Sequence, residues 1–192
     1  MHSLLFGFFL ALTLVATIDG ALNLSSNERP RIPVQEGEIP WDPPPVELAC
    51  PQGFFSLGDS CYAVFDEDSY MLWWDDAQTF CGSLAAGGRL VELETAEELA
   101  LVKNHLLESD YDCGDHSWYW IGGDEIGDTN TFKWASSGQM IDASDWYPGE
   151  PNNSGSGDAI FLACPAPYNW QWIDWGKLNS RRPICEAPPI EV

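Results

Sequence analysis

The chain has 192 residues, a length that fits one domain with some residues to spare. It carries 30 Asp and Glu against 8 Lys and Arg, which gives a formal net charge of -22 at pH 7. Such a surface repels phosphate backbones and anionic lipid headgroups, so nucleic acids and membrane surfaces are disfavoured as partners. Most of the acidic side chains are expected to serve solubility, and a few clustered carboxylates suit a divalent cation.

An uncharged apolar run, Leu4–Ala16, lies near the N-terminus and is followed by small and polar residues. It is too short to span a bilayer, which needs about 20 residues, and it is typical of the apolar part of a secretory signal peptide. No Lys or Arg precedes it, and a buried core helix is the alternative. We therefore expect residues 1–20 to be a signal peptide, the protein to be secreted and extracellular, and no membrane span elsewhere.

Residues 21–47 form a proline-rich segment with few large apolar side chains. Because proline cannot donate a backbone hydrogen bond and so little apolar surface cannot offset the entropy lost on folding, we expect a disordered leader. It contains a glycosylation sequon at Asn23. The folded domain is expected over residues 48–187, and residues 188–192 are expected to form a tail.

An even number of cysteines in the expected domain indicates a disulfide framework in a secreted chain. They are Cys50, Cys61, Cys81, Cys113, Cys164 and Cys185. Spacing alone leaves their pairing open. There is no Cys-x-x-Cys, and the metal-like spacing of Cys113 and His116 lacks a second ligand pair, so zinc is disfavoured.

Two helices are expected in the first half of the domain. The first covers about Met71–Ser83, where Trp74 and Cys81 fall on one buried face at helical spacing. The second begins after Thr95, whose hydroxyl caps the helix and which forms a capping box with Glu98.

From Trp118 onward, short apolar and aromatic runs alternate with Gly, Asn, Asp and Ser, which predicts short strands and long loops. The chain has 10 tryptophans. We expect most of these rings to lie in the core, and an exposed ring that stacks on sugar is the alternative for any one of them.

Several short motifs follow one another in an order that resembles the C-type lectin domain family, in its long form, over essentially the whole expected domain. They are Cys50-Pro51-Gln52-Gly53-Phe54, Ser60-Cys61-Tyr62, Trp74-x-x-Ala77-x-x-x-Cys81, Gly88-x-Leu90-Val91-x-Leu93, Trp120-Ile121-Gly122-Gly123, Glu150-Pro151-Asn152, Trp172-x-Asp174 and Pro183-Ile184-Cys185-Glu186. The resemblance implies an α+β fold in which two helices flank small antiparallel sheets and long loops hold the ligand.

The resemblance also implies how the cysteines pair. The implied disulfides are Cys50–Cys61, Cys81–Cys185 and, from the two cysteines that remain, Cys113–Cys164. Most of the family has a further disulfide below the ligand loops, and its two positions hold Ile160 and Lys177 here.

In this family a calcium ion lies among the long loops and binds two neighbouring hydroxyl groups of one sugar. Carboxylate and amide oxygens are the ligands that calcium prefers. The resemblance assigns both the metal and the sugar to Glu150, Asn152, Asp158 and Asp174, with a cis peptide bond before Pro151. The Glu-Pro-Asn motif implies mannose-type sugars.

One family ligand is absent, because Ile173 replaces the Asn of the family's Trp-Asn-Asp motif. Isoleucine has no side-chain oxygen, so one metal bond and one sugar hydrogen bond are lost and we expect weakened calcium affinity.

A second calcium site of the family would use Asp124, Asp128 and Asp158. Two further positions where the family has acidic residues hold Asn153 and Ala159, so this site is incomplete. Ordinary turn chemistry is the alternative for Asp124 and Asp128.

Together these features predict a secreted, calcium-dependent carbohydrate-binding protein that recognises mannose-type glycans in innate immunity. The alternative is a lectin-like module that binds an extracellular protein, or an acidic matrix or crystal surface, without sugar activity. No enzyme is expected, because only His105 and His116 follow the signal peptide and neither Gly-x-Ser-x-Gly nor His-Glu-x-x-His is present. The oligomeric state stays open, since no collagen-like or heptad segment is visible.

Overall fold

The computed structural model describes residues 45–192, apart from 116 and 153–157. The expected signal peptide and nearly all of the expected leader lie outside the described residues. Within the described part of the chain, no helix is both long and apolar enough to cross a bilayer.

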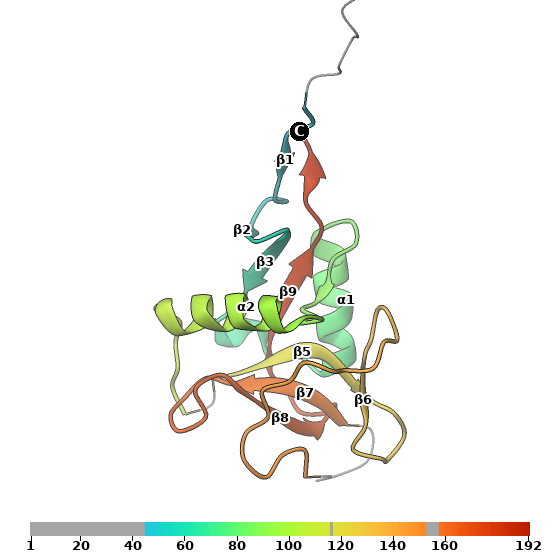
Figure 1. Cartoon of the computed structure of the whole chain (residues 1–192). Coiled ribbons are helices and arrows are strands. Elements are labelled where there is room, and N and C mark those ends of the chain that lie inside the picture. The colour runs from blue at the N-terminus through green and yellow to red at the C-terminus, as the bar shows by residue number, and fades with distance from the viewer. Residues whose placement is uncertain (1–44, 116, 153–157) are drawn as a thin grey trace, which may run out of the picture. The chain divides into compact units, whose positions relative to one another are not determined.

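The described residues form two α-helices, one short 3-10 helix and ten strands (Figure 1). The helices are η1 (Asp68–Tyr70), α1 (Trp74–Leu84) and α2 (Ala96–Glu108). The strands are β1 (Leu48–Ala49), β2 (Phe55–Leu57), β3 (Ser60–Val64), β4 (Arg89–Leu90), β5 (Trp118–Glu125), β6 (Phe132–Trp134), β7 (Asp158–Ala163), β8 (Gln171–Gly176), β9 (Arg182–Ala187) and β10 (Ile190–Glu191).

One mixed sheet joins most of the strands, in the order β2-β3-β9-β5-β7-β8, with β4 beside β9 and β6 beside β5. All pairs in it are antiparallel except β5 and β9, which are parallel. The predicted α+β fold with two helices is confirmed, and its main sheet is mixed because β5 and β9 run parallel. The last strand, β9, pairs with β3 on one side and β5 on the other, so it fuses the two halves into one sheet.

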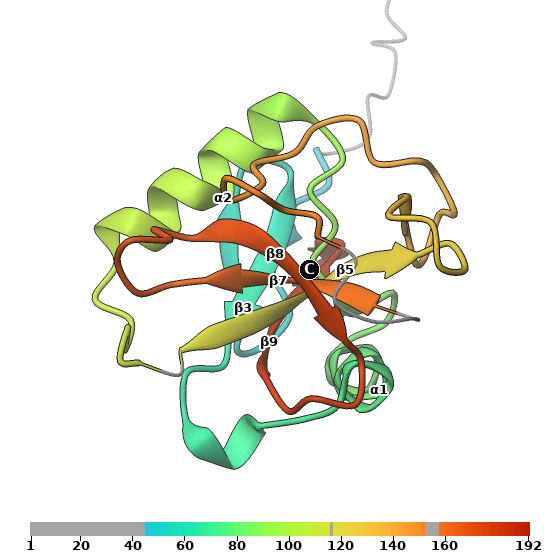
Figure 2. The same cartoon turned by 90° about the horizontal axis from the view of Figure 1, so that it is seen from below.

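The two helices cover opposite faces of β5, β7 and β8 (Figure 2). Successive side chains of a strand point to opposite faces. Ile160 of β7 lies in a core cluster with Val102 of α2, whereas its neighbour Phe161 lies in a second cluster with Trp74 of α1. Each helix thus buries its apolar side against a separate core, and the strands form the wall between them.

The helix ends follow the local chemistry with two differences from expectation. Helix α1 begins at Trp74 and not near Met71, because Leu72 exchanges backbone hydrogen bonds of 2.9 Å with Arg181 and keeps this stretch extended. Thr95 caps α2 as expected, accepting a 3.1 Å hydrogen bond from the Glu98 amide. The Glu98 carboxylate, however, accepts from the amide of Glu94 at 3.0 Å and does not close the capping box on Thr95 itself.

The expected tail is part of the fold. Ile190 and Glu191 form β10, which pairs antiparallel with Leu48 and Ala49 of β1. The two prolines before β10 lack amide protons, but they interrupt the pairing for only two residues. The folded domain therefore extends beyond residue 187.

Three disulfides fasten these elements, in the same three pairs that the resemblance implies. They are Cys50–Cys61, Cys81–Cys185 and Cys113–Cys164, with Cα atoms 5.5, 5.4 and 5.3 Å apart. The third fastens the segment before β5 to the end of β7, where the Cys164 amide also donates to the Ser117 carbonyl oxygen at 3.1 Å.

Candidate functional site

The loop between β6 and β7 carries the Glu-Pro-Asn motif and is fixed to the outer strand β8. The Tyr147 amide donates to the Trp172 carbonyl oxygen at 2.9 Å, and the Trp172 amide donates to the Asp145 carbonyl oxygen at 2.9 Å. The Glu150 amide donates back to Tyr147 at 2.9 Å. Glu150 therefore follows a turn that these hydrogen bonds hold beside β8.

Three of the predicted ligands come together here. The Asn152 side-chain amide donates to Glu150 Oε1 at 3.0 Å, and the Asn152 backbone amide donates to Asp174 Oδ1 at 3.0 Å. The peptide bond between Glu150 and Pro151 is cis, as the resemblance implies. One amide and two carboxylates thus face one another between the loop and β8.

The charges of this cluster are poorly compensated by the chain. Burial, and then the hydrogen bond to Asp174 and its charge, raise the pKa of Glu150 to about 7. Within the described residues, no N–H or O–H group donates to the buried oxygens Glu150 Oε2 and Asp174 Oδ2, so the two carboxylates interact directly with each other and a proton on Glu150 is favoured. Two adjacent carboxylates with unused lone pairs are costly to bury unless a cation accompanies them.

These oxygens fit part of a calcium site. Calcium takes about six to eight oxygen ligands, and this cluster supplies carboxylate and amide oxygens of the right kind. Within the described residues, no three His, Cys, Asp or Glu side chains are grouped so that they could hold a metal by themselves. A calcium ion here would depend on Asn152, backbone oxygens and water as well.

Asp158 lies further along the sheet than the three residues above. It begins β7 opposite Gly176, two residues beyond Asp174 on β8, and is fully buried. Its amide donates to Glu125 Oε2 at 3.1 Å, and Glu125 Oε1 accepts from Thr129 at 3.0 Å. Glu125, which sequence analysis missed, therefore holds a turn after β5 against the start of β7.

Ile173 lies on the other face of β8 from Asp174. It pairs in register with Phe161 and is 9% exposed, within the core that α1 covers. The residue that replaces the family's Asn is therefore a packing residue, which offers the cluster no oxygen.

The predicted second calcium site already contains a cation of the chain. The Lys177 ammonium lies 2.5 Å from Asp124 Oδ1 and 4.4 Å from the centroid of the Trp74 ring. Asp128 follows Gly127, which has a φ of 68° typical of a turn. This site remains a prediction, in which calcium would have to displace Lys177.

The two positions without the family's further disulfide have taken other roles. Lys177 forms the ion pair with Asp124, and Ile160 packs so tightly against Gly123 that a Cβ atom there would lie 2.4 Å from Ile160 Cδ1. Packing and charge thus join these strands where a covalent bond is absent.

An aromatic cavity of about 220 Å³ borders the cluster and shares Glu150 with it. Its other lining residues are Trp118, Tyr147, Phe161, Tyr168, Ile173, Trp175 and Arg181. Sequence analysis missed this cavity, because it placed most tryptophans in the core. The sequence feature that could have indicated a binding cavity is Arg181, one of only 8 basic residues in the chain.

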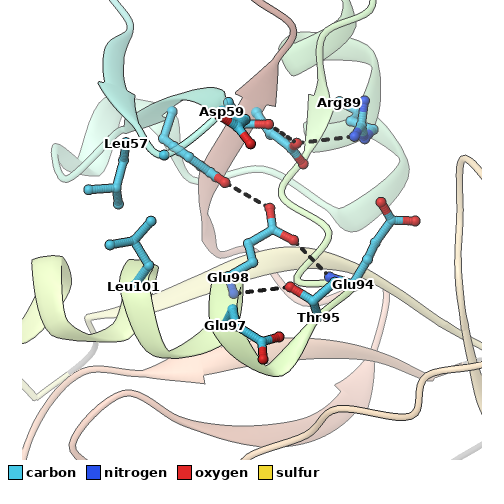
Figure 3. A pocket seen from close by; sticks show the side chains of 12 residues that line it. Leu57, Asp59, Arg89, Glu94, Thr95, Glu97, Glu98 and Leu101 are labelled. Carbon is cyan, nitrogen blue, oxygen red and sulfur yellow. Dashed lines mark hydrogen bonds and ion pairs between the residues drawn. The ribbon is translucent and has the colours of Figure 1, made fainter.

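A larger hollow, of about 390 Å³, lies between β3 and the start of α2 (Figure 3). Its main carboxylate, Glu98, accepts from the Tyr62 hydroxyl at 2.7 Å and from the Glu94 amide (Figure 3). Glu186 is likewise paired with Arg89 at 3.1 Å. Burial, and then the bond to Glu98, raise the pKa of Tyr62. These groups are occupied by one another, which indicates a structural network.

Comparison with known proteins agrees with the motifs. Residues 71–187 match the family model described as Lectin C-type domain. The chain is 30% identical over 150 residues to C-type lectin 37Da of Drosophila melanogaster, covering 72% of this chain and 74% of that one. It is 35% identical over 140 residues to Snaclec 3 of Sistrurus catenatus edwardsii, covering 72% and 84%.

Solved structures share the fold. Human lithostathine superposes with a TM-score of 0.62 at 24% identity, covering 79% of this chain and 99% of that one. The complex of SPL-1 with GlcNAc superposes with a TM-score of 0.57 at 27% identity, covering 72% and 94%.

Proposed function

Since the chain belongs to the C-type lectin domain family, whose domains bind ligands and are not enzymes, we propose that it is an extracellular, calcium-dependent glycan-binding protein. Three disulfides in one small domain support an extracellular location. We assign calcium and sugar to Glu150, Asn152 and Asp174, with Asp158 as a further ligand predicted from the family pattern.

One observation carries this proposal. The buried oxygens Glu150 Oε2 and Asp174 Oδ2 receive no hydrogen bond from an N–H or O–H group of the described residues, and the two carboxylates lie close enough to raise the pKa of Glu150. Binding of a cation between two buried carboxylates that lack hydrogen-bond donors stabilises the folded protein. Asn152 donates hydrogen bonds to both residues and so holds them in place before a cation binds. This preorganisation lowers the entropy cost of forming the site.

The chain's own groups also supply the polar pattern for a sugar. When bound, calcium would coordinate two neighbouring hydroxyl groups of one sugar ring. The Glu150 carboxylate accepts a hydrogen bond from one hydroxyl, and the Asn152 amide donates to the other. The order of acceptor and donor along the motif favours mannose-type sugars, as the family resemblance implies.

Retention on mannose beads tests the proposal. We expect the protein to bind at millimolar calcium, to elute with a chelator, and to bind weakly because Ile173 supplies no oxygen. The double variant Glu150→Gln and Asn152→Asp reverses the polar pattern and should shift preference towards galactose. Glu108→Gln, an exposed acid on α2, is the matched control and should bind like the wild type.

The alternative, a module for an extracellular protein or an acidic matrix or crystal surface, is favoured by the loss of one calcium ligand at Ile173. A wild-type protein that mannose and galactose beads never retain at millimolar calcium would exclude the sugar assignment. Binding to a mineral surface that survives Glu150→Gln and weakens with salt would support the alternative.

A further inference from the structure

Arg181 is the only cationic side chain among the described residues that line the aromatic cavity. Its backbone is fixed by two hydrogen bonds of 2.9 Å with Leu72, and its side chain lies over the cavity wall. The guanidinium carbon lies 4.3 Å from the centroid of the Trp118 ring and 5.1 Å from that of Phe161. The residue is 8% exposed, so the charge is held inside the protein by ring faces.

Among the described residues, this guanidinium forms no ion pair, because no carboxylate lies within ion-pair distance of it. Its Nη1 donates to the neighbouring Ser180 carbonyl oxygen at 2.8 Å, and its buried Nε has no partner in the described part of the chain. Burial lowers the pKa of Arg181 to about 10, so the group stays protonated at neutral pH and bears the cost of desolvation.

Arg182, the next residue, shows how another buried guanidinium of this protein is paired with carboxylates. Arg182 Nη2 lies 2.7 Å from Asp68 and 3.5 Å from Asp112. In a chain with 30 acidic residues, partners for a buried cation are plentiful. A guanidinium that lacks one and lines a cavity is therefore available to an anion that enters from outside.

The walls of the cavity suit a ring-shaped ligand. The rings of Tyr147 and Tyr168 lie 4.7 Å apart, and those of Trp118 and Phe161 lie 5.5 Å apart. Trp175, which also lines the cavity, is 41% exposed. The volume of about 220 Å³ is below the range of about 300–1,000 Å³ for drug-sized ligands, and it fits a single sugar unit whose apolar face packs on the Trp175 ring.

We propose that this cavity binds the carboxylate-bearing unit of an acidic glycan without calcium, with the carboxylate on Arg181 and the sugar ring against the exposed ring of Trp175. The planar guanidinium matches a carboxylate in a two-bond geometry. Glu150 also lines the cavity, and its negative charge disfavours a second acidic group on the ligand. The inference goes beyond the calcium-dependent site and does not need a metal.

A titration with matched sugars in a chelator tests this inference. The probes are methyl glucuronide and methyl glucoside, which differ by a carboxylate, and the readout is the Kd from ligand-observed NMR. We expect the glucuronide to bind at least about tenfold more tightly, since a charge-assisted pair replaces a neutral contact. Equal affinity for the two sugars would overturn the proposal. A methyl glucoside 6-sulfate that binds more tightly than the glucuronide would overturn the assignment to a carboxylate.

Substitutions in the cavity lining test whether the glucuronide binds there. Arg181→Met keeps the apolar stem and should abolish the preference for glucuronide. Because Arg181 also packs on core rings, Trp175→Ala, at an exposed ring, gives an independent reading and should weaken glucuronide binding about tenfold. Trp73→Ala, at a ring that is 52% exposed and lies outside the cavity lining, should leave the Kd unchanged. An unchanged Kd in a folded Trp175→Ala variant would contradict the model.

The calcium site and the Arg181 cavity can be disproved independently of each other. A protein that binds glucuronide in chelator but never mannose beads in calcium has lost only the calcium assignment. A protein that is retained on mannose beads and shows no preference for glucuronide has lost only the Arg181 assignment.

Discussion

The ion pair between Lys177 and Asp124, 2.5 Å long, joins the end of β8 to β5. In the family register, Lys177 stands where most members carry a cysteine of an additional disulfide. The ammonium also rests on the Trp74 ring. A side-chain cation thus occupies the neighbourhood in which a second calcium ion was expected.

Removing that ammonium should cost little stability and expose Asp124 to metal. For Lys177→Met we expect the free energy of unfolding in chelator to fall by about 1 kcal/mol or less, because both partners are partly exposed. A calcium titration by calorimetry should then show an added weak site. Lys133→Met is the control, since Lys133 forms no ion pair among the described residues. An identical calcium isotherm in the Lys177 variant would argue against the second site.

The disulfide Cys113–Cys164 should contribute strongly to stability. It closes a loop with a sequence separation of 51, for which the chain-entropy model gives about 4 kcal/mol. We expect the double variant Cys113→Ser and Cys164→Ser to lose an amount of that order in urea unfolding. A loss below about 1 kcal/mol would show that this cross-link restricts the unfolded chain much less than the chain-entropy model requires.

Glu92 should make the protein less stable as the pH rises. Burial raises the pKa of Glu92 above its ordinary value of 4.5, although Ser136 donates to both carboxylate oxygens. A raised pKa in the folded state favours the protonated form, so its contribution is complete below the unfolded pKa and is lost as the pH rises through the folded pKa.

The variant Glu92→Gln isolates that effect. It should be less stable at every pH, because glutamine cannot accept on both atoms, but its stability should decline less than that of the wild type above pH 4.5. Urea unfolding at a series of pH values measures the difference between the two curves. If the stability curves of the wild type and the variant run parallel, the pKa of Glu92 is the same in the folded and the unfolded state.

Acid should weaken calcium binding. Glu150, Asp158 and Asp174 must be ionised to act as ligands, and protons compete with the metal for their oxygens. Calcium affinity measured from neutral to acid pH is therefore expected to decrease steadily, together with retention on mannose beads. Calcium and sugar binding that stay flat over this range would remove these carboxylates from the site.

Much of the fold follows from short-range chemistry in the sequence. The spacing of Trp74 and Cys81 predicts the buried face of α1, and Thr95 predicts the start of α2. The meeting of Glu150, Asn152 and Asp174 was predicted only through the family resemblance, because 22 positions separate the last two and the chain must fold back between them.

The aromatic cavity could not be predicted from the sequence, for a different reason. Whether a strand residue lines a cavity depends on its face and on its neighbours across the sheet. Arg181 and Arg182 are adjacent and chemically identical, yet only Arg182 meets Asp68 and Asp112. Composition cannot distinguish a paired guanidinium from one without a counter-ion, and only the three-dimensional arrangement of distant acids does so.

The pairing of β1 with β10 has a practical consequence. It brings Leu48 and Glu191 together at the end of the domain remote from the loop that carries Glu150 (Figure 1). A tether attached after Val192 would therefore leave that loop facing outward. Several copies displayed on one bead or scaffold in this orientation could engage a glycan array at once, so a weak single-site interaction becomes measurable through avidity.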